Sequence, residues 1–181
     1  MLSWLLIPAA AAQDLLSVAV GLSTQASTVF EDTTLVLESG PQAHLAIQPG
    51  TFRHSVGLRY NTNAVPGWTP GEFTSAALSL STQAMYDNGA GRPIAYAGGG
   101  LTMARYRAQI TEYRFNGWQL DHDDLQSGLG IHATGSWRAV HQEAFAVELA
   151  YTLRRSFLSD TIIGPWHHLL EATVWLNVPG L

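Results

Sequence analysis

The feature that most limits what this chain can fold into is a two-residue alternation of apolar and polar side chains along most of its length. The clearest case is residues 145–153, where Phe, Val, Leu, Tyr and Leu alternate with Ala, Glu, Ala and Thr. Successive side chains of a β-strand point to opposite faces, so this period indicates strands with unlike faces. No segment shows a convincing helical period over three turns.

Eight segments show this alternation and are predicted to be strands: residues 16–24, 35–47, 56–60, 76–86, 94–106, 129–138, 145–153 and 170–178. Several are about as long as the 9–11 residues that a tilted strand needs to cross a bilayer. Within 94–106, three consecutive glycines at 98–100 blur the parity and indicate a bulge or close packing. The fold class expected is therefore all-β.

After the first connection, short and long connections between the predicted strands alternate. The short ones contain Pro49-Gly50, Asn88-Gly89 and His141-Gln142, which are typical of turns. The long ones centre on residues 62–73, 111–126 and 155–167. Tight turns on one rim and long loops on the other predict an eight-stranded antiparallel up-and-down transmembrane β-barrel.

Composition supports this topology and excludes several functions. Charged residues are 13% of the chain, against a typical share of about 25%, and apolar residues are 46%. A net charge of −5 with no lysine argues against binding nucleic acid, and the absence of cysteine excludes disulfides, thiolate metal sites and cysteine nucleophiles. The predicted polar face mixes small residues with Glu38, His44, Arg59, His132, Arg138, Glu148, Arg154 and Glu171. Such a set suits the narrow interior of an eight-stranded barrel.

The first twelve residues have the character of a targeting segment. Residues 1–12 are an apolar stretch ending in Ala10-Ala11-Ala12, which is typical of a secretory signal peptide, although no positive charge precedes it. The alternative is a buried N-terminal strand or helix. We expect residues 1–12 to be a signal peptide and residues 13–181 to form the barrel domain.

At this point the chain resembles a known family. The segments IAYAGGGLTMARYR, SGLGIHATGSWRAV, AFAVELAYTLRRS and HHLLEATVWLNV are similar in pattern to the second half of small outer-membrane barrels of the OmpA/OmpX type. The resemblance is to a pattern over about residues 15–178, without a sharp motif. It implies a bacterial outer-membrane location, contact with lipid and lipopolysaccharide, and insertion by the barrel-assembly machinery.

Three groups of side chains are candidate sites within such a barrel. An ion-pair cluster in the lumen is expected from Glu38, Arg59, Arg138, Glu148 and Glu171. Its structural role would be to fill and rigidify the interior, and the alternative is a gated ion path; the narrow interior of an eight-stranded barrel favours the structural role. Aromatic belts at the two lipid interfaces are expected from Phe30, Tyr60, Tyr86, Trp137, Phe145 and Tyr151. Loop contacts with a partner are expected from Trp68, Trp118 and Trp166, whose alternative role is to cap the barrel mouth.

Catalytic and metal sites find weaker support. Lipid A deacylases of this architecture use a Ser-His-acid triad, but His54 and Ser55 are adjacent and so face opposite sides, and His168 and Glu171 also differ in parity. Residues 121–124 (Asp-His-Asp-Asp), in the longest predicted loop, could hold a divalent cation together with His167 and His168. The spacing of these residues matches no metal-binding motif, however. We therefore expect no catalytic residue, no metal and no cofactor.

The function expected from the sequence is a non-enzymatic outer-membrane barrel with a structural or surface-contact role. Its lumen would be plugged, and its extracellular loops would bind a protein partner. Two alternatives stay open: an outer-membrane lipid-modifying hydrolase, and a secreted soluble barrel that binds a small apolar ligand.

Overall fold

The computed structural model describes residues 15–29, 34–63, 71–87, 93–114, 117–142, 144–157 and 163–178. The predicted signal segment, residues 1–12, lies outside these ranges. In the part of the chain that is described, no helix is long and apolar enough to cross a membrane.

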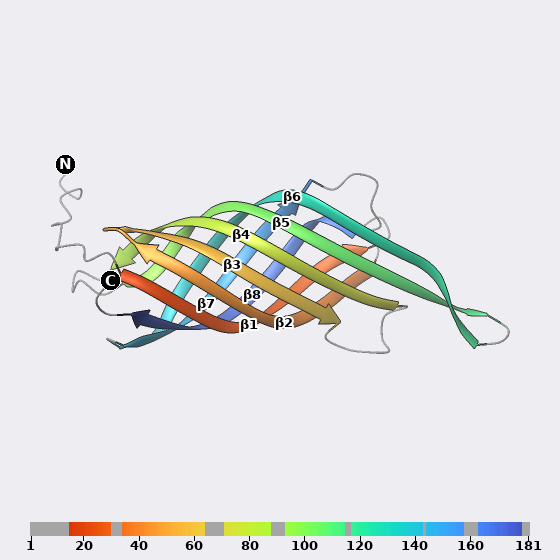
Figure 1. The fold of residues 1–181 in the computed structure, drawn as a ribbon, viewed down its shortest axis with the longest axis horizontal. Helices are drawn as coiled ribbons and strands as arrows, with labels where there is room; N and C mark the ends of the chain where they lie inside the picture. The colour runs from red at the N-terminus through yellow and green to blue at the C-terminus, as the bar shows by residue number, and fades with distance from the viewer. Residues whose placement is uncertain are drawn as a thin grey trace.

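These residues form one antiparallel sheet of eight strands closed into a barrel (Figure 1). Each strand pairs with its neighbour in the sequence, and β1 pairs with β8 to close the sheet. The strands are β1 (Leu15–Val29), β2 (Thr34–Gln48), β3 (Phe52–Asn63), β4 (Gly71–Asp87), β5 (Pro93–Arg114), β6 (Gly117–His141), β7 (Phe145–Ser156) and β8 (Ile163–Val178). The predicted all-β, eight-stranded up-and-down barrel is confirmed.

The two ends of the barrel differ. The tight-turn rim is the end at which β2–β3, β4–β5 and β6–β7 are connected, and at which β1 begins beside the end of β8. At the opposite end, here called the hairpin rim, β5 and β6 project well beyond the other strands (Figure 1). The last pair between β4 and β5 is Gly71 with Ile110, and the pairing of β6 with β7 starts at Gly130 and Ser156.

The prediction of a long loop at residues 111–126 was wrong. Strand β5 continues to Arg114 and β6 begins at Gly117, so most of this segment is a β-hairpin, with a register shift after Ile110. The alternating pattern used to recognise strands reflects burial of one face, whereas a projecting hairpin is held by backbone hydrogen bonds between its own two strands. The strand segments within residues 111–126 were therefore not recognised, because their sequence does not alternate between apolar and polar residues.

The apolar face of the sheet points outward and the polar face inward. Along β7, the side chain of Leu149 is 47% exposed on the outside, whereas its neighbour Glu148 is 2% exposed. Leucine, isoleucine and valine side chains from all eight strands share the outward exposure of Leu149. A barrel folded for water places its apolar face inside, so this arrangement is that of a membrane barrel.

The glycines at 98–100 allow close packing between strands and do not form a bulge. The register of β5 with β4 and with β6 is unbroken through all three. A Cβ atom at Gly98 would overlap the carbonyl oxygen of Thr82, and one at Gly100 would overlap that of Leu80. Of the two possibilities raised by the sequence, close backbone approach is the one observed.

Candidate functional site

Several charged side chains are buried in the lumen, because alternate residues of each strand point inward. Near the tight-turn rim, Arg53 of β3 crosses the lumen to Glu148 of β7, with both guanidinium–carboxylate distances at 2.7 Å. The same guanidinium group donates to Gln83 and stacks over the Tyr96 ring, 3.8 Å from its centroid. Arg138 approaches Glu148 from β6, with its Nε 3.5 Å from the carboxylate. One carboxylate thus serves two arginines.

A second ion pair lies further along the barrel. Arg59 of β3 donates to Glu171 of β8 at 2.9 Å, again joining strands that are not neighbours. Cross-lumen pairs of this kind tie together parts of the sheet that the backbone ladder does not connect directly. Removing one partner of such a buried pair leaves an uncompensated charge, which is usually strongly destabilising.

Toward the hairpin rim, an amide links the remaining charges. Gln25 accepts a hydrogen bond from Arg154 at 2.8 Å and donates one to Glu38 at 2.9 Å. Its amide nitrogen also lies 2.9 Å from the hydroxyl of Ser27. Arg154 and Glu38 are therefore connected through Gln25 and make no direct ion pair.

Two of the inward histidines are hydrogen-bonded to the polar lining of the lumen. His132 is held between Ser81 and Thr102, at 2.8 and 2.9 Å. His167 is fully buried, with its Nδ1 2.8 Å from Ser27, its Nε2 3.2 Å from the Tyr106 hydroxyl, and its ring stacked on that of Tyr106. The sequence had placed His167 at the mouth of a loop, but β8 begins earlier than predicted and carries this residue into the lumen.

The space left between these groups is small. A polar cavity of about 50 Å³ lies in the middle of the lumen. Among the side chains that line it are His44, Arg59, His132, Arg154 and Glu171. Because one water molecule needs about 10–15 Å³ of such volume, the cavity has room for only a few.

The five residues of the predicted ion-pair cluster are therefore inward-facing, but they are distributed among separate contacts. Arg59 meets Glu171, Arg138 meets Glu148, and Glu38 bonds to Gln25. Arg53 was missed, because the strand predicted in this region began only at residue 56, whereas β3 begins at Phe52. The signal that could have found it is the parity of Arg53, Ser55, Gly57 and Arg59, which alternate with Phe52, Val56, Leu58 and Tyr60 and are interrupted only by His54.

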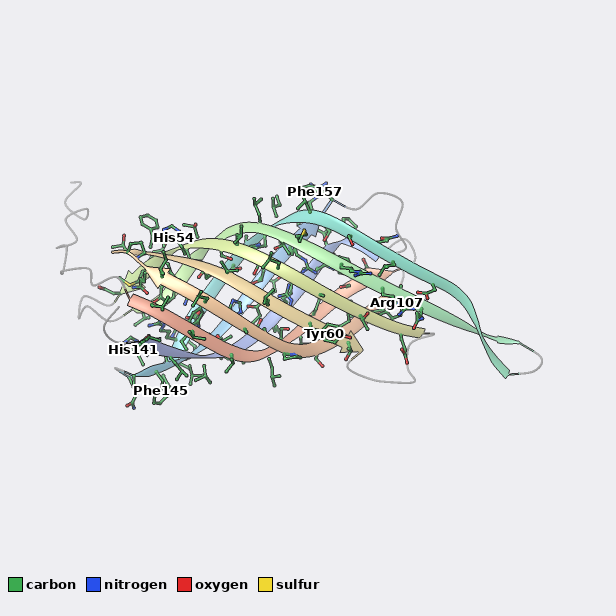
Figure 2. The ribbon with its side chains drawn as sticks, viewed as in Figure 1. His54, Tyr60, Arg107, His141, Phe145 and Phe157 are labelled. Carbon is green, nitrogen blue, oxygen red and sulfur yellow. The ribbon has the colours of Figure 1, made fainter. Side chains whose placement is uncertain are left out.

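On the outside, aromatic side chains lie toward both rims. Tyr86, Trp137 and Phe145 are near the tight-turn rim, and Tyr60 and Tyr151 are in the half toward the hairpin rim. Figure 2 shows Phe145 at the end of the barrel with the tight turns and Tyr60 in the half toward the hairpin rim. Of the other predicted aromatics, Phe30 and Trp68 and the side chain of Trp118 lie outside the described part of the structure, whereas Trp166 is exposed on β8.

Outward charges gather on the half toward the hairpin rim. Arg107 of β5 binds Asp123 of β6 through two contacts, at 3.0 and 2.7 Å (Figure 2 labels Arg107). This hydrogen-bonded carboxylate raises the pKa of the Arg107 guanidinium above its ordinary value. Arg155 lies over the rings of Trp166 and Phe157, 5.4 and 5.9 Å from their centroids.

The structure does not bring the considered hydrolase residues together. His54 bonds to Thr82 on the outer surface at 3.0 Å, and His168 bonds to the Tyr151 hydroxyl at 2.7 Å. Glu171 faces the lumen and binds Arg59. Among the described side chains, no group of three or more His, Asp or Glu is placed to hold a metal ion. The side chains of Asp121, His122 and Asp124 lie outside that set.

A closed antiparallel sheet of eight strands with an apolar exterior and a charged, filled interior is the fold of the small outer-membrane β-barrels, and this chain has that fold. Neisserial surface protein A, NspA, is similar with a TM-score of 0.68 and 13% identity, over 89% of this chain and 96% of NspA. Ail, the attachment invasion locus protein of Yersinia pestis, is similar with a TM-score of 0.62 and 8% identity, over 92% of this chain and 99% of Ail.

Ail in complex with the heparin analogue sucrose octasulfate gives a TM-score of 0.64 and 10% identity, over 92% of this chain and 100% of Ail. At such identities the similarity shows the fold alone. No protein-family model and no curated protein sequence matches the chain.

Proposed function

We propose that this protein is a non-enzymatic β-barrel of the outer membrane of a Gram-negative bacterium, with a structural or surface-contact role. The observation that carries the proposal is the orientation of the two faces: leucine, isoleucine and valine side chains cover the outside, and ion pairs fill the inside. In this proposal residues 1–12 direct export, and the barrel-assembly machinery inserts the chain. The tight-turn rim lies in the periplasm, where turns are short in such barrels, and the hairpin rim is extracellular.

The ion pairs support a plugged lumen. Arg53–Glu148 and Arg59–Glu171 cross the barrel at two levels, and the cavity between them is about 50 Å³. An eight-stranded barrel is just wide enough for its own side chains to fill it. We therefore assign the lumenal charges a structural role.

The β5–β6 hairpin supports a role in contacting a protein partner. Residues 117–128 of β6 pair with β5 but, among the described residues, with no strand on the β7 side. An unpaired strand edge is a template for the addition of another strand. Because the sequence of this segment contains the acidic residues Asp121, Asp123 and Asp124, a basic extended segment fits it better than a second copy of the same hairpin would.

The outward arginines support contact with lipopolysaccharide. Arg105 and Arg155 are exposed on the hairpin side of the apolar surface, beside aromatic residues such as Tyr60 and Trp166. Phosphate groups of the outer leaflet are natural partners for guanidinium groups at this level.

The first test is membrane fractionation combined with gel mobility of boiled and unboiled samples. Recovery in the outer membrane with a mobility shift on boiling is the expected result. Recovery in the soluble fraction without a shift would overturn the proposal in favour of a soluble ligand-binding barrel. Release of fatty acid from lipopolysaccharide, abolished by His168→Ala and retained by His54→Ala, would instead establish a hydrolase.

The partner proposal is tested separately on the purified barrel in detergent. A basic extended peptide should bind the full barrel and bind more weakly when residues 111–121 are replaced by Asn-Gly, because the unpaired edge of β6 is then shortened to residues 122–128. Sucrose octasulfate, the ligand in the Ail complex, is a second probe because Arg105, Arg107 and Arg155 are exposed on this side. Equal peptide binding by both barrels would contradict a role for the β6 edge.

A further inference from the structure

An open groove lies on the outer surface of the barrel, across β2, β3, β4 and β5. Its volume is about 520 Å³, and its lining includes outward apolar side chains: Leu45, Ile47, Val56, Leu80 and Leu101. Gly99 of β5 also lines the groove. A Cβ atom at Gly99 would overlap the carbonyl oxygen of His132 on β6, so the close packing of these two strands keeps a side chain out of this position. The hollow therefore follows from the way the strands pack.

Two polar side chains line the same groove. His54 of β3 and Thr82 of β4 are directly paired and exposed, with Nδ1 of His54 3.0 Å from the Thr82 hydroxyl (Figure 2 labels His54). The other ring nitrogen of His54, Nε2, has no hydrogen-bond partner among the described residues. A polar group that faces hydrocarbon without a partner is costly. An outward histidine on the apolar surface therefore calls for a partner from outside the chain.

The depth of His54 limits what this partner can be. His54 is two residues along β3 from Phe52, whose exposed ring lies at the tight-turn rim. A strand tilted by about 45° advances about 2.3 Å in depth per residue, so His54 lies about 5 Å deeper than Phe52. Aromatic rings lie at the headgroup level of a bilayer, and the interfacial layer is about 5–8 Å thick on each side. His54 is therefore at the boundary between headgroups and hydrocarbon, which is the level of the ester groups of phospholipids.

The hydrogen-bonding chemistry of His54 agrees with this level. An ester carbonyl only accepts hydrogen bonds, so it needs an N–H donor. When the Thr82 hydroxyl donates to Nδ1 of the neutral ring, the ring proton is on Nε2, which then serves as that donor. The volume of the groove is within the range of about 300–1,000 Å³ that is typical of ligand sites, and its apolar lining suits an acyl chain.

We propose that this groove binds a phospholipid of the periplasmic leaflet. One acyl chain lies against Leu80 and Leu101, over Gly99, and its ester carbonyl accepts a hydrogen bond from Nε2 of His54. The recognised feature is the ester group and not the charge of the headgroup. This inference rests on the membrane location and orientation proposed above, and it is independent of the contacts proposed for the hairpin rim.

The test compares two phosphatidylethanolamines with the same chains, one ester-linked and the other ether-linked, because the ether lacks the carbonyl group. Full-length barrel that shows the mobility shift on boiling is purified in detergent, and bound lipid is measured by native mass spectrometry at increasing lipid concentration. The unmodified barrel should bind the ester lipid about two- to tenfold more tightly, the difference expected for one neutral hydrogen bond. Equal binding of the two lipids would overturn the proposal without the need for any variant.

Three variants locate the site. His54→Leu should remove the preference for the ester lipid, whereas the matched variant His168→Leu, which replaces another outward histidine bonded to a hydroxyl, should retain it. Val56→Trp places an indole in the groove and should weaken the binding of both lipids. A preference that survives His54→Leu, or unchanged binding in Val56→Trp, would reject the groove as the site. None of these results would affect the proposed membrane location, because fractionation and the shift on boiling test it separately.

Discussion

At the scale of single residues, Glu148 is the carboxylate on which the lumenal network most depends, because both Arg53 and Arg138 approach it. Replacing it by Gln (Glu148→Gln) leaves two buried guanidinium groups without a countercharge. We expect a loss of about 3–5 kcal/mol in the free energy of unfolding, measured by urea titration of the barrel in detergent micelles. The matched control is Asp123→Asn, which breaks the exposed pair with Arg107 and should change stability little. A Glu148→Gln barrel as stable as the control would show that water compensates these arginines.

Two consecutive residues of β7 test the orientation of the faces. Leu149 is exposed on the apolar exterior, and Ala150 lines the lumenal cavity. Leu149→Arg should destabilise the inserted barrel by about 2–4 kcal/mol if it lies near the bilayer midplane, because a charge then faces hydrocarbon. Ala150→Ser adds a hydroxyl to an already polar interior and should be tolerated. The yield of heat-modifiable protein in the membrane measures both, and equal tolerance would mean that the faces are reversed.

At the scale of elements, the β5–β6 hairpin should be separable from the barrel. Beyond the pair of Gly71 with Ile110, β5 loses its β4 partner, and β6 gains β7 only at Gly130. Replacing residues 111–121 by Asn-Gly therefore removes pairs that β5 and β6 make with each other alone. We expect the shortened barrel to keep its mobility shift on boiling, since projecting segments tolerate change. Loss of the folded form would show that the hairpin contributes to closure of the barrel.

The elements also show how far sequence alone reaches. Strand β7 was predictable because lipid and lumen impose opposite demands on its two faces, and its alternation records them. The hairpin outside the apolar surface lacks that imprint, and residues 111–126 were mistaken for a loop. The pairing of Arg53 with Glu148, which are 95 residues apart, was not predictable because it depends on strand register and on closure of the sheet across β3 and β7. Parity can assign a charge to the lumen, but only the closed barrel determines which partner it meets.

At the scale of the whole molecule, these pairs bear on whether the barrel conducts ions. Arg53–Glu148 and Arg59–Glu171 span the lumen at two levels, and the cavity between them is only about 50 Å³. The unmodified barrel in a planar bilayer should therefore show no sustained conductance. The double variant Arg59→Ala and Glu171→Ala widens one level and should produce brief low-conductance openings. The charge-swapped pair Arg59→Glu and Glu171→Arg keeps the bulk and the attraction, and should stay closed. Steady conductance through the unmodified barrel would mean that the lumenal charges line an ion path and do not fill the interior.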